Sequence, residues 1–228
     1  MMSNAELHEQ FSNRVKAHPA YKLSSGERVP SVTTITGILN KPALVKWANN
    51  LGLRGIDSTK YVDALAVIGT LAHDMILADL SGESVAGIAS RADPATRDLA
   101  ENCYLSFCAW RKQHDIRPIS LEQSLVSERY RYGGRADMVA EIDGALELVD
   151  FKTGKGIYPE MFYQLAGYAP LLLENGIVDR PIERARILNI PRAETEIFLE
   201  KAKSSLRIEW QIFQKCLEIY NLVKEIEK

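Results

Sequence analysis

GGRADMVAEIDGALELVDFKTGK, residues 133–155, contains two alternating apolar and polar segments on either side of an Asp-Gly pair. Asp-Gly between such segments is the strongest short-range signal for a β-hairpin with a two-residue turn. If Asp143 and Gly144 form the turn, the two residue numbers of each facing pair in the hairpin sum to 287. Asp137 and Asp150 then lie opposite each other on one face of the sheet, with Cβ atoms about 5 Å apart.

The same face of this predicted hairpin carries a lysine and apolar groups. Lys152 lies two residues beyond Asp150, so its side chain projects from that face, opposite Arg135. Leu148 and Val139 are on the face as well, so the carboxylates emerge among apolar side chains. Facing carboxylates repel unless a cation lies between them, and a hard divalent cation prefers such oxygen ligands. The alternative is a solvated charge pair on an exposed sheet face.

Length and composition indicate one globular domain. The chain has 228 residues, of which 46% are hydrophobic, so it can bury a sizeable core. We expect a peripheral segment over residues 1–26 and a single domain over residues 27–228. The net charge of -2 means that a polyanion must be held by a local basic groove.

Targeting signals and cysteine pairs are both expected to be absent. The start of the chain is polar, and we find no apolar run long enough to span a bilayer. The sequence therefore predicts no membrane association and a cytoplasmic location. If the chain is phage-encoded, this would be the host cytoplasm. The three cysteines are odd in number and lack a C-x-x-C spacing, which argues against disulfides and structural zinc. Buried thiols are the simpler interpretation.

Periodicity elsewhere predicts a mixed α/β fold. Ser31 and Asp93 are each placed to cap a helix, although the β-branched residues after Ser31 leave a strand open there. Helices are expected over residues 30–40, 41–52, 58–82, 93–115, 158–176 and 201–228. Strands are expected over residues 121–132, 135–143, 145–153, 184–190 and 195–200, with turns at residues 133–134 and 143–144.

Three short motifs in this order resemble a known family. GRAD ends at Asp137, DFK spans Asp150 to Lys152, and QLAGY spans Gln164 to Tyr168. They match the G-x-x-D, D/E-x-K and Q-x-x-x-Y pattern of the PD-(D/E)XK nuclease superfamily, in its RecB-like exonuclease branch. GTLAH, which ends at His73, matches that branch's upstream histidine. With PSVTTI further upstream, the chain is similar to mitochondrial genome maintenance exonucleases and phage exonucleases.

The resemblance implies a fold, a cofactor and a set of roles. The fold would be a restriction-endonuclease-like core, with a central mixed β-sheet flanked by helices. Mg²⁺ or Mn²⁺ would be bound by His73, Asp137, Asp150 and the backbone carbonyl of Phe151. Lys152 would orient or activate the attacking water and stabilise phosphate charge. Glu128, on the strand before GRAD, matches no role in the motif.

Physical reasoning favours some of these roles over others. Two acids beside Lys152 favour its charged form, so an electrostatic role suits it better than general-base catalysis. A lone histidine on an apolar helix face is usually a core residue, which leaves both interpretations open for His73. Gln164 and Tyr168 share one helical face, where they would support Lys152, touch nucleic acid or simply pack.

Basic residues near the motifs suggest where nucleic acid would bind. Arg135 and Lys155 flank the predicted site, and Arg129 and Arg131 are close in sequence. For the last two, a solvated position on a strand is the alternative.

These inferences predict a Mg²⁺- or Mn²⁺-dependent deoxyribonuclease. We expect an exonuclease that acts on single-stranded or frayed DNA ends, in DNA repair or recombination, with a recombination or replication protein as a further partner. The alternative is a catalytically inactive nucleic-acid-binding or recombination-partner module with the same fold. A structural protein with merely solvated acids is a third interpretation.

Overall fold

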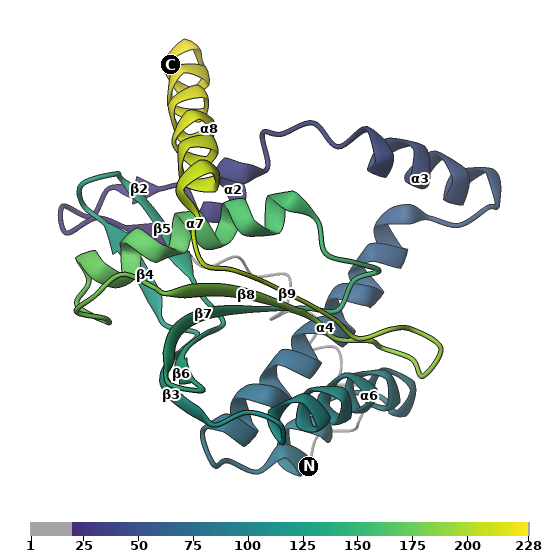
Figure 1. Cartoon of the computed structure of the whole chain (residues 1–228). Coiled ribbons are helices and arrows are strands. Elements are labelled where there is room, and N and C mark those ends of the chain that lie inside the picture. The colour runs from purple at the N-terminus through teal and green to yellow at the C-terminus, as the bar shows by residue number, and fades with distance from the viewer. Residues whose placement is uncertain (1–19, 228) are drawn as a thin grey trace. The chain divides into compact units, whose positions relative to one another are not determined.

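The computed structural model describes residues 20–227, which divide into two compact units (Figure 1). Unit 1 comprises residues 40–109 and 190–197, and unit 2 comprises residues 20–39, 110–189 and 198–227. A single domain over residues 27–228 therefore stays a prediction.

Unit 2 is built on a mixed five-stranded sheet (Figure 1). The strand order is β3 (Ile116–Leu121), β6 (Met138–Ile142), β7 (Ala145–Lys152), β8 (Arg184–Asn189) and β9 (Leu199–Lys203). Only the β7–β8 pair is parallel, and helix α7 (Pro159–Glu174) connects these two strands. The predicted α/β class, with a mixed sheet and packed helices, is confirmed.

The β6–β7 hairpin has the predicted turn and register. Asp143 and Gly144 have φ values of 51° and 82°, the two positive values that a type I′ turn requires. Met138 pairs with Val149, and the facing numbers sum to 287 along the hairpin. The Asp143 carboxylate also accepts a hydrogen bond of 2.9 Å from the backbone N–H of Asp115, which holds the turn against the end of β3.

The strand predicted over residues 121–132 is confirmed only over residues 124–127, and its predicted pairing with residues 135–143 is wrong. Residues 124–127 and 132–135 form a separate two-stranded sheet, β4 (Ser124–Ser127) with β5 (Tyr132–Arg135), and β3 is the strand that pairs with β6. The predicted turn at residues 133–134 lies inside β5. A glycine is needed there for another reason, because a Cβ on Gly133 would lie 2.3 Å from Tyr21 Cγ.

The start of the described chain is partly buried rather than peripheral. β1 (Tyr21–Lys22) pairs with β2 (Arg28–Val29), and Tyr21 and Leu23 are both buried. Glu128, which matched no motif role, contacts this segment. Its Oε1 accepts a 2.6 Å hydrogen bond from the backbone N–H of Ser24. Residues 1–19 of the predicted peripheral segment lie outside the described residues.

Helix α7 covers the face of the sheet that carries Val139 and Leu148. Phe162 and Leu165 of α7 belong to the same buried cluster as these two residues. Helices α2 (Val32–Thr36) and α8 (Arg207–Ile226) add further members to that cluster. The predicted cap of α2 is confirmed, since the Ser31 hydroxyl accepts a 3.0 Å hydrogen bond from the Thr34 N–H. The C-terminal helix begins six residues later than predicted because residues 199–203 pair with β8 as β9.

Unit 1 is helical. It contains α3 (Pro42–Leu53), α4 (Ser58–Leu80), α5 (Val85–Ala89) and most of α6 (Pro94–Arg111). The capping role predicted for Asp93 is confirmed by a 3.1 Å hydrogen bond from the Thr96 N–H to its carboxylate. The sequence did not predict α5, which is a single short turn of helix.

Helix α4 contradicts the expectation that no apolar run is long enough to span a bilayer. By length and composition this helix could cross one. Seven of its side chains are buried, among them Leu71 and Met75. One such helix is weak evidence for a membrane, because a core helix of a soluble protein has the same properties. The cytoplasmic location stays a prediction.

The second face of the sheet contains a buried ion-pair network. Glu147 is fully buried on β7, and its carboxylate accepts hydrogen bonds of 2.6 and 2.7 Å from Arg186 and of 2.7 Å from Arg184. Arg186 also contacts Glu200 of β9, whose carboxylate accepts a 3.1 Å hydrogen bond from Trp110. This network ties β7, β8 and β9 together, and each of its charges has an opposite partner.

We expect Glu147→Ala to destabilise the fold by about 3–5 kcal/mol, because it leaves the buried Arg186 guanidinium without its main carboxylate. Glu141→Ala is the matched control, since the partly exposed Glu141 contacts Arg117 and Arg180 at 3.8 and 3.5 Å and should cost less than about 1 kcal/mol. Urea denaturation of both variants measures the difference. Equal losses would contradict a structural role for the buried network.

Candidate active site

Asp137 and Asp150 meet at the open end of the β6–β7 hairpin. Asp137 directly precedes β6, and continuing the observed register places it opposite Asp150, which is 3% exposed. The backbone N–H of Phe151 donates a 2.7 Å hydrogen bond to Asp137 Oδ2. The carboxylate of Asp137 is therefore held against β7, directly beside the position of Asp150.

The same hydrogen bond indicates where the Phe151 carbonyl points. Within an extended strand, the N–H and C=O groups of one residue point toward the same neighbouring strand. Since the Phe151 N–H reaches the Asp137 carboxylate, its C=O group points to the Asp137 side as well. That this carbonyl is a metal ligand stays a prediction.

Lys152 forms an ion pair with the buried acid. Its Nζ lies 2.5 Å from Asp150 Oδ2, and its side chain is 26% exposed. Burial lowers the pKa of Lys152, but the charges of Asp150 and Asp137 and the hydrogen bond to Asp150 outweigh burial and raise this pKa above its ordinary value. Lys152 is thus a cation at neutral pH in the metal-free chain, which suits an electrostatic role.

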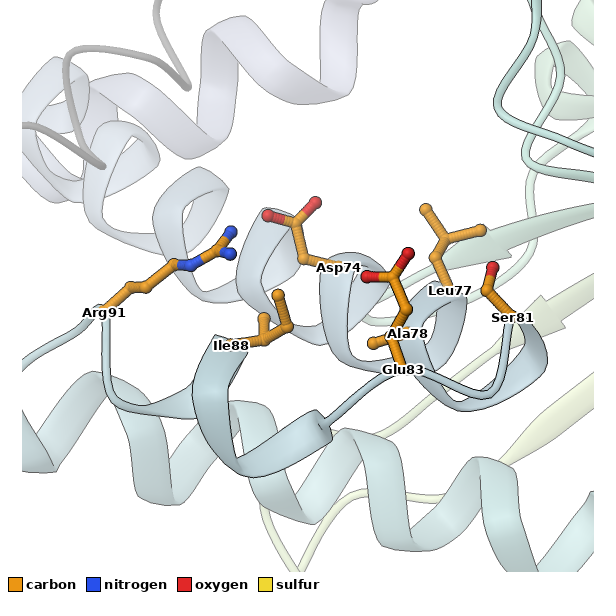
Figure 2. A pocket seen from close by; sticks show the side chains of 7 residues that line it. All are labelled: Asp74, Leu77, Ala78, Ser81, Glu83, Ile88 and Arg91. Carbon is orange, nitrogen blue, oxygen red and sulfur yellow. The ribbon is translucent and has the colours of Figure 1, made fainter.

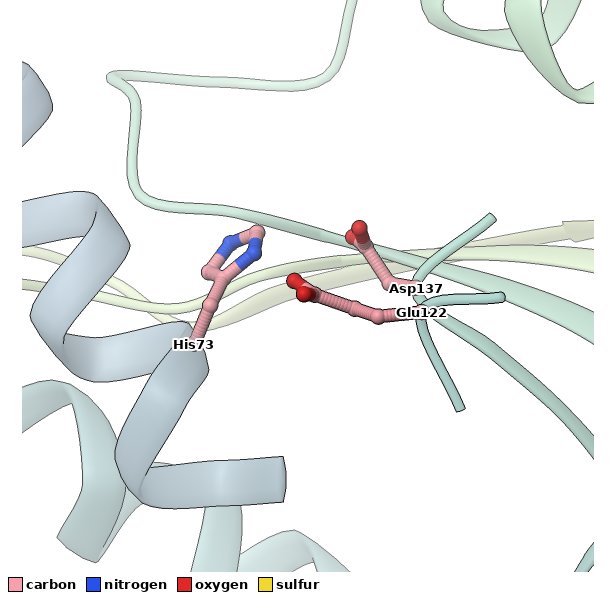
Figure 3. Close-up of side chains that lie close together, drawn as sticks. All are labelled: His73, Glu122 and Asp137. Carbon is pink, nitrogen blue, oxygen red and sulfur yellow. The ribbon is translucent and has the colours of Figure 1, made fainter. Parts of the chain in front are cut away.

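Glu122 is a third acid at this position, and the sequence analysis missed it. The Glu122 N–H donates a 3.0 Å hydrogen bond to the Asp137 backbone carbonyl, which continues the β3–β6 pairing by one residue. Carboxylate oxygens of Glu122 and Asp137 lie within 4.8 Å of each other, and Figure 3 shows both side chains extending in the same direction. No motif includes Glu122, so only the correct partner for β6 could have revealed it.

Tyr168 of α7 lies over the same end of the sheet. A Cβ on Gly134 would approach Tyr168 Cε1 to 2.7 Å, so the ring occupies the space above this glycine. Burial, followed by the charges of Asp150 and Asp137, raises the pKa of Tyr168 well above its ordinary value, so the phenol is neutral at neutral pH. Gln164, one helical turn earlier, is half-buried, and its role stays a prediction.

The predicted basic patch separates into two groups. Arg135 is exposed at the site end of β5 and forms a 3.2 Å ion pair with Glu122, while Lys155 is exposed in the loop after β7. Arg129 and Arg131 lie in the turn at the opposite end of the β4–β5 hairpin, where Arg131 pairs with Glu27. Of the four basic residues, Arg135 is thus the one with a direct contact to a site acid.

His73 is half-buried, and two of the three cysteines are buried. His73 lies on α4 of unit 1 and is also drawn in Figure 3. Its role as a metal ligand stays a prediction that rests on the sequence motif. Cys103 and Cys216 are buried, and burial raises the pKa of the Cys103 thiol to about 12, so that this thiol is an unreactive core group.

The residues of unit 2 fit a hard divalent cation. Glu122, Asp137 and Asp150 supply carboxylate oxygens on one face at one end of the sheet, and the nearby cations are side chains that could move aside. Mg²⁺, Mn²⁺ and Ca²⁺ all take such oxygen ligands, and the donor set alone does not select among them.

Unit 1 contains a hollow of about 200 Å³ (Figure 2). Its lining residues are Asp74, Leu77, Ala78, Ser81, Glu83, Ile88 and Arg91. Charged side chains of both signs line it beside small apolar patches, and it contains no residue of the motifs.

Comparisons with known proteins add little to this picture. No protein-family model and no curated protein match the chain. A solved structure described as "Crystal structure of SSO0001" is similar over 94% of this chain and 85% of that chain, with 13% sequence identity and a TM-score of 0.39. A likeness this low carries no argument about function.

We expect Mg²⁺ or Mn²⁺ to stabilise the folded chain. At a metal concentration one hundred times the dissociation constant, the gain should be about 2.7 kcal/mol. Asp137→Asn should remove most of this gain, because it deletes a ligand charge while an amide oxygen can still accept the Phe151 hydrogen bond. Glu141→Gln, on the same face as Asp137 but at the far end of β6, should retain the gain. Thermal melts with EDTA and with each metal test this, and equal gains in both variants would argue against the site.

We expect Gly134→Ala to destabilise unit 2 by about 1–3 kcal/mol, because the new methyl group would lie 2.7 Å from Tyr168 and 2.9 Å from Val32. Gly156→Ala is the control, since the nearest atom there, in Tyr158, is 3.8 Å away. Chemical denaturation compares the two variants. If both are as stable as the wild type, Tyr168 is not packed on Gly134 as described.

Proposed function

We propose that the chain is a metal-dependent deoxyribonuclease with a restriction-endonuclease-like core in unit 2. The observation that supports this best is the meeting of Asp137 and Asp150 across the hairpin, with Lys152 ion-paired beside them. A solvated surface pair would not explain why Asp150 is buried at 3% exposure. The order of the sequence motifs, GRAD, DFK and QLAGY, supports the same reaction.

Residues of unit 2 would hold Mg²⁺ or Mn²⁺ through Asp137, Asp150 and the Phe151 carbonyl, with Glu122 as an additional carboxylate. His73 remains the ligand that the sequence motif adds. A divalent cation bound there would supply a more acidic water and neutralise phosphate charge.

Side chains of the chain itself would act on the phosphodiester. The Lys152 ammonium, which is held in place by Asp150, would stabilise the negative charge that grows on the phosphate oxygens as water adds to phosphorus. Tyr168 would remain protonated, so that its hydroxyl could donate a hydrogen bond to a carboxylate or a phosphate oxygen. Arg135 and Lys155, both exposed near the site, would bind the flanking phosphates.

The substrate we propose is a single-stranded or frayed DNA end. This part of the proposal comes from the resemblance to exonucleases, and the near-neutral net charge fits local rather than broad binding of DNA. A recombination or replication protein would supply such ends.

We expect the purified chain to degrade end-labelled linear single-stranded DNA in Mg²⁺ or Mn²⁺ and to leave a closed circular strand intact. Lys152→Ala should lower the rate by roughly 100-fold or more, as the loss of a charge-stabilising group does elsewhere. Lys201→Ala, which removes an exposed lysine on β9, should cleave at the wild-type rate. Circular dichroism verifies that both variants are folded.

Each other outcome has a distinct meaning. Cleavage of circles would make the chain an endonuclease, and full activity in Lys152→Ala would refute the proposed site. Metal-dependent DNA binding without any cleavage of single-stranded, duplex or RNA substrates would instead support the inactive binding module.

A further inference from the structure

Asn189 lies beside the proposed active site and belongs to none of the motifs. It is the last residue of β8 and the parallel partner of Lys152 on β7. Paired residues of neighbouring strands share a face, so Asn189, Lys152 and Asp150 all lie on the face that carries the acids. Its side chain is almost completely buried, with 2% of the residue exposed.

The orientation of the Asn189 amide is fixed by a backbone carbonyl. Nδ2 donates a 3.0 Å hydrogen bond to the carbonyl oxygen of Gly154, in the loop that follows Lys152. Because a carbonyl can only accept, the nitrogen must face Gly154 and the amide oxygen must point away from it. The opposite flip would set two acceptors against each other.

The amide oxygen of Asn189 is a buried acceptor that receives no hydrogen bond from the part of the chain that the structure describes. Among residues 20–227, Asn189 Oδ1 is buried and has no hydrogen-bond partner. Buried polar atoms without a partner are rare and costly in native proteins, and each one calls for an explanation such as an additional ligand or a second conformation. A proton donor that arrives in another state of the site is one such explanation.

Lys152 is a donor that can reach this atom. Its ammonium carries three N–H groups on a flexible four-carbon stem, and it contacts Asp150 at 2.5 Å. The two strands are about 5 Å apart, which is within the length of a lysine side chain. Once the Asp150 carboxylate serves as a metal ligand, it is a poorer hydrogen-bond acceptor for Lys152. The bound cation and the Lys152 ammonium also repel each other, because both are positively charged.

We propose that Asn189 is a positioning residue. When Asp150 binds a divalent cation, Asn189 Oδ1 accepts a hydrogen bond from the Lys152 ammonium. This inference rests on the proposed function and deepens it. Asn189 thereby keeps the ammonium next to the phosphate position, and the Nδ2 bond to Gly154 fixes which way the amide faces.

The test follows the ammonium directly, without cleavage. In ¹⁵N-labelled protein, the Lys152 ammonium signal is assigned by its absence in Lys152→Ala, and its proton exchange with water is measured in EDTA and in Mg²⁺. We expect Mg²⁺ to leave this exchange slow in the wild type and to accelerate it roughly 10-fold or more in Asn189→Leu, which is of similar size but has no acceptor. Asn175→Leu is the control, because Asn175 Nδ2 likewise donates to backbone carbonyls, of Val126 and Leu171, but lies away from the site. If Asn189→Leu does not fold, Asn189→Ala takes its place.

A cleavage assay separates positioning from simple bracing of the loop. Asn189→Leu should lower kcat/KM roughly 10-fold at saturating Mg²⁺ in the wild-type background and should add no further loss in Lys152→Ala. Equal exchange rates in Asn189→Leu and the wild type, at Mg²⁺ levels that stabilise both, would overturn the inference and leave the proposed function standing. An additional loss in Lys152→Ala would also overturn it, in favour of loop bracing. If Mg²⁺ stabilises neither protein, the proposed metal site fails and this inference fails with it.

Discussion

The type I′ turn at Asp143 and Gly144 is the constraint on which the site depends. Side chains alternate between sheet faces with a period of two, so a shift of one residue in the β6–β7 pairing would move every side chain of one strand to the other face. The positive φ values of this turn fix the pairing and with it the position of Asp137 opposite Asp150. The contact from Asp143 to Asp115 adds β3 to the same arrangement.

Contacts within the chain offset the charges of the clustered acids. Three carboxylates at one end of a sheet would repel, but each has a favourable contact in the chain. Lys152 pairs with Asp150, Arg135 pairs with Glu122, and the Phe151 N–H donates to Asp137. At the site we propose, a divalent cation would compete with these internal cations, so its affinity would depend on how readily Lys152 and Arg135 turn away.

Local signals in the sequence predicted what is local in the structure. The Asp-Gly turn, the Ser31 and Asp93 caps and the mixed α/β class were all predictable, because each depends on neighbouring residues. The pairing of β3 with β6 was not, since it joins segments separated by the whole β4–β5 hairpin. Glu122 was missed for the same reason. Gly133 and Gly134 were assigned to a turn because the sequence cannot show that Tyr21 and Tyr168 fill the space above them.

The two faces of β7 carry acidic residues with different kinds of ion pair. Glu147 faces one side, where Arg184 and Arg186 satisfy its carboxylate with three hydrogen bonds, so that it is fixed and serves stability. Asp150, three residues later, faces the other side, and its cation is a lysine with a flexible stem and partial exposure. A rigid guanidinium holds a carboxylate in one geometry, whereas a lysine can exchange one acceptor for another. The chain therefore has a permanent buried ion pair where strands must be joined, and an exchangeable one where we propose that chemistry occurs.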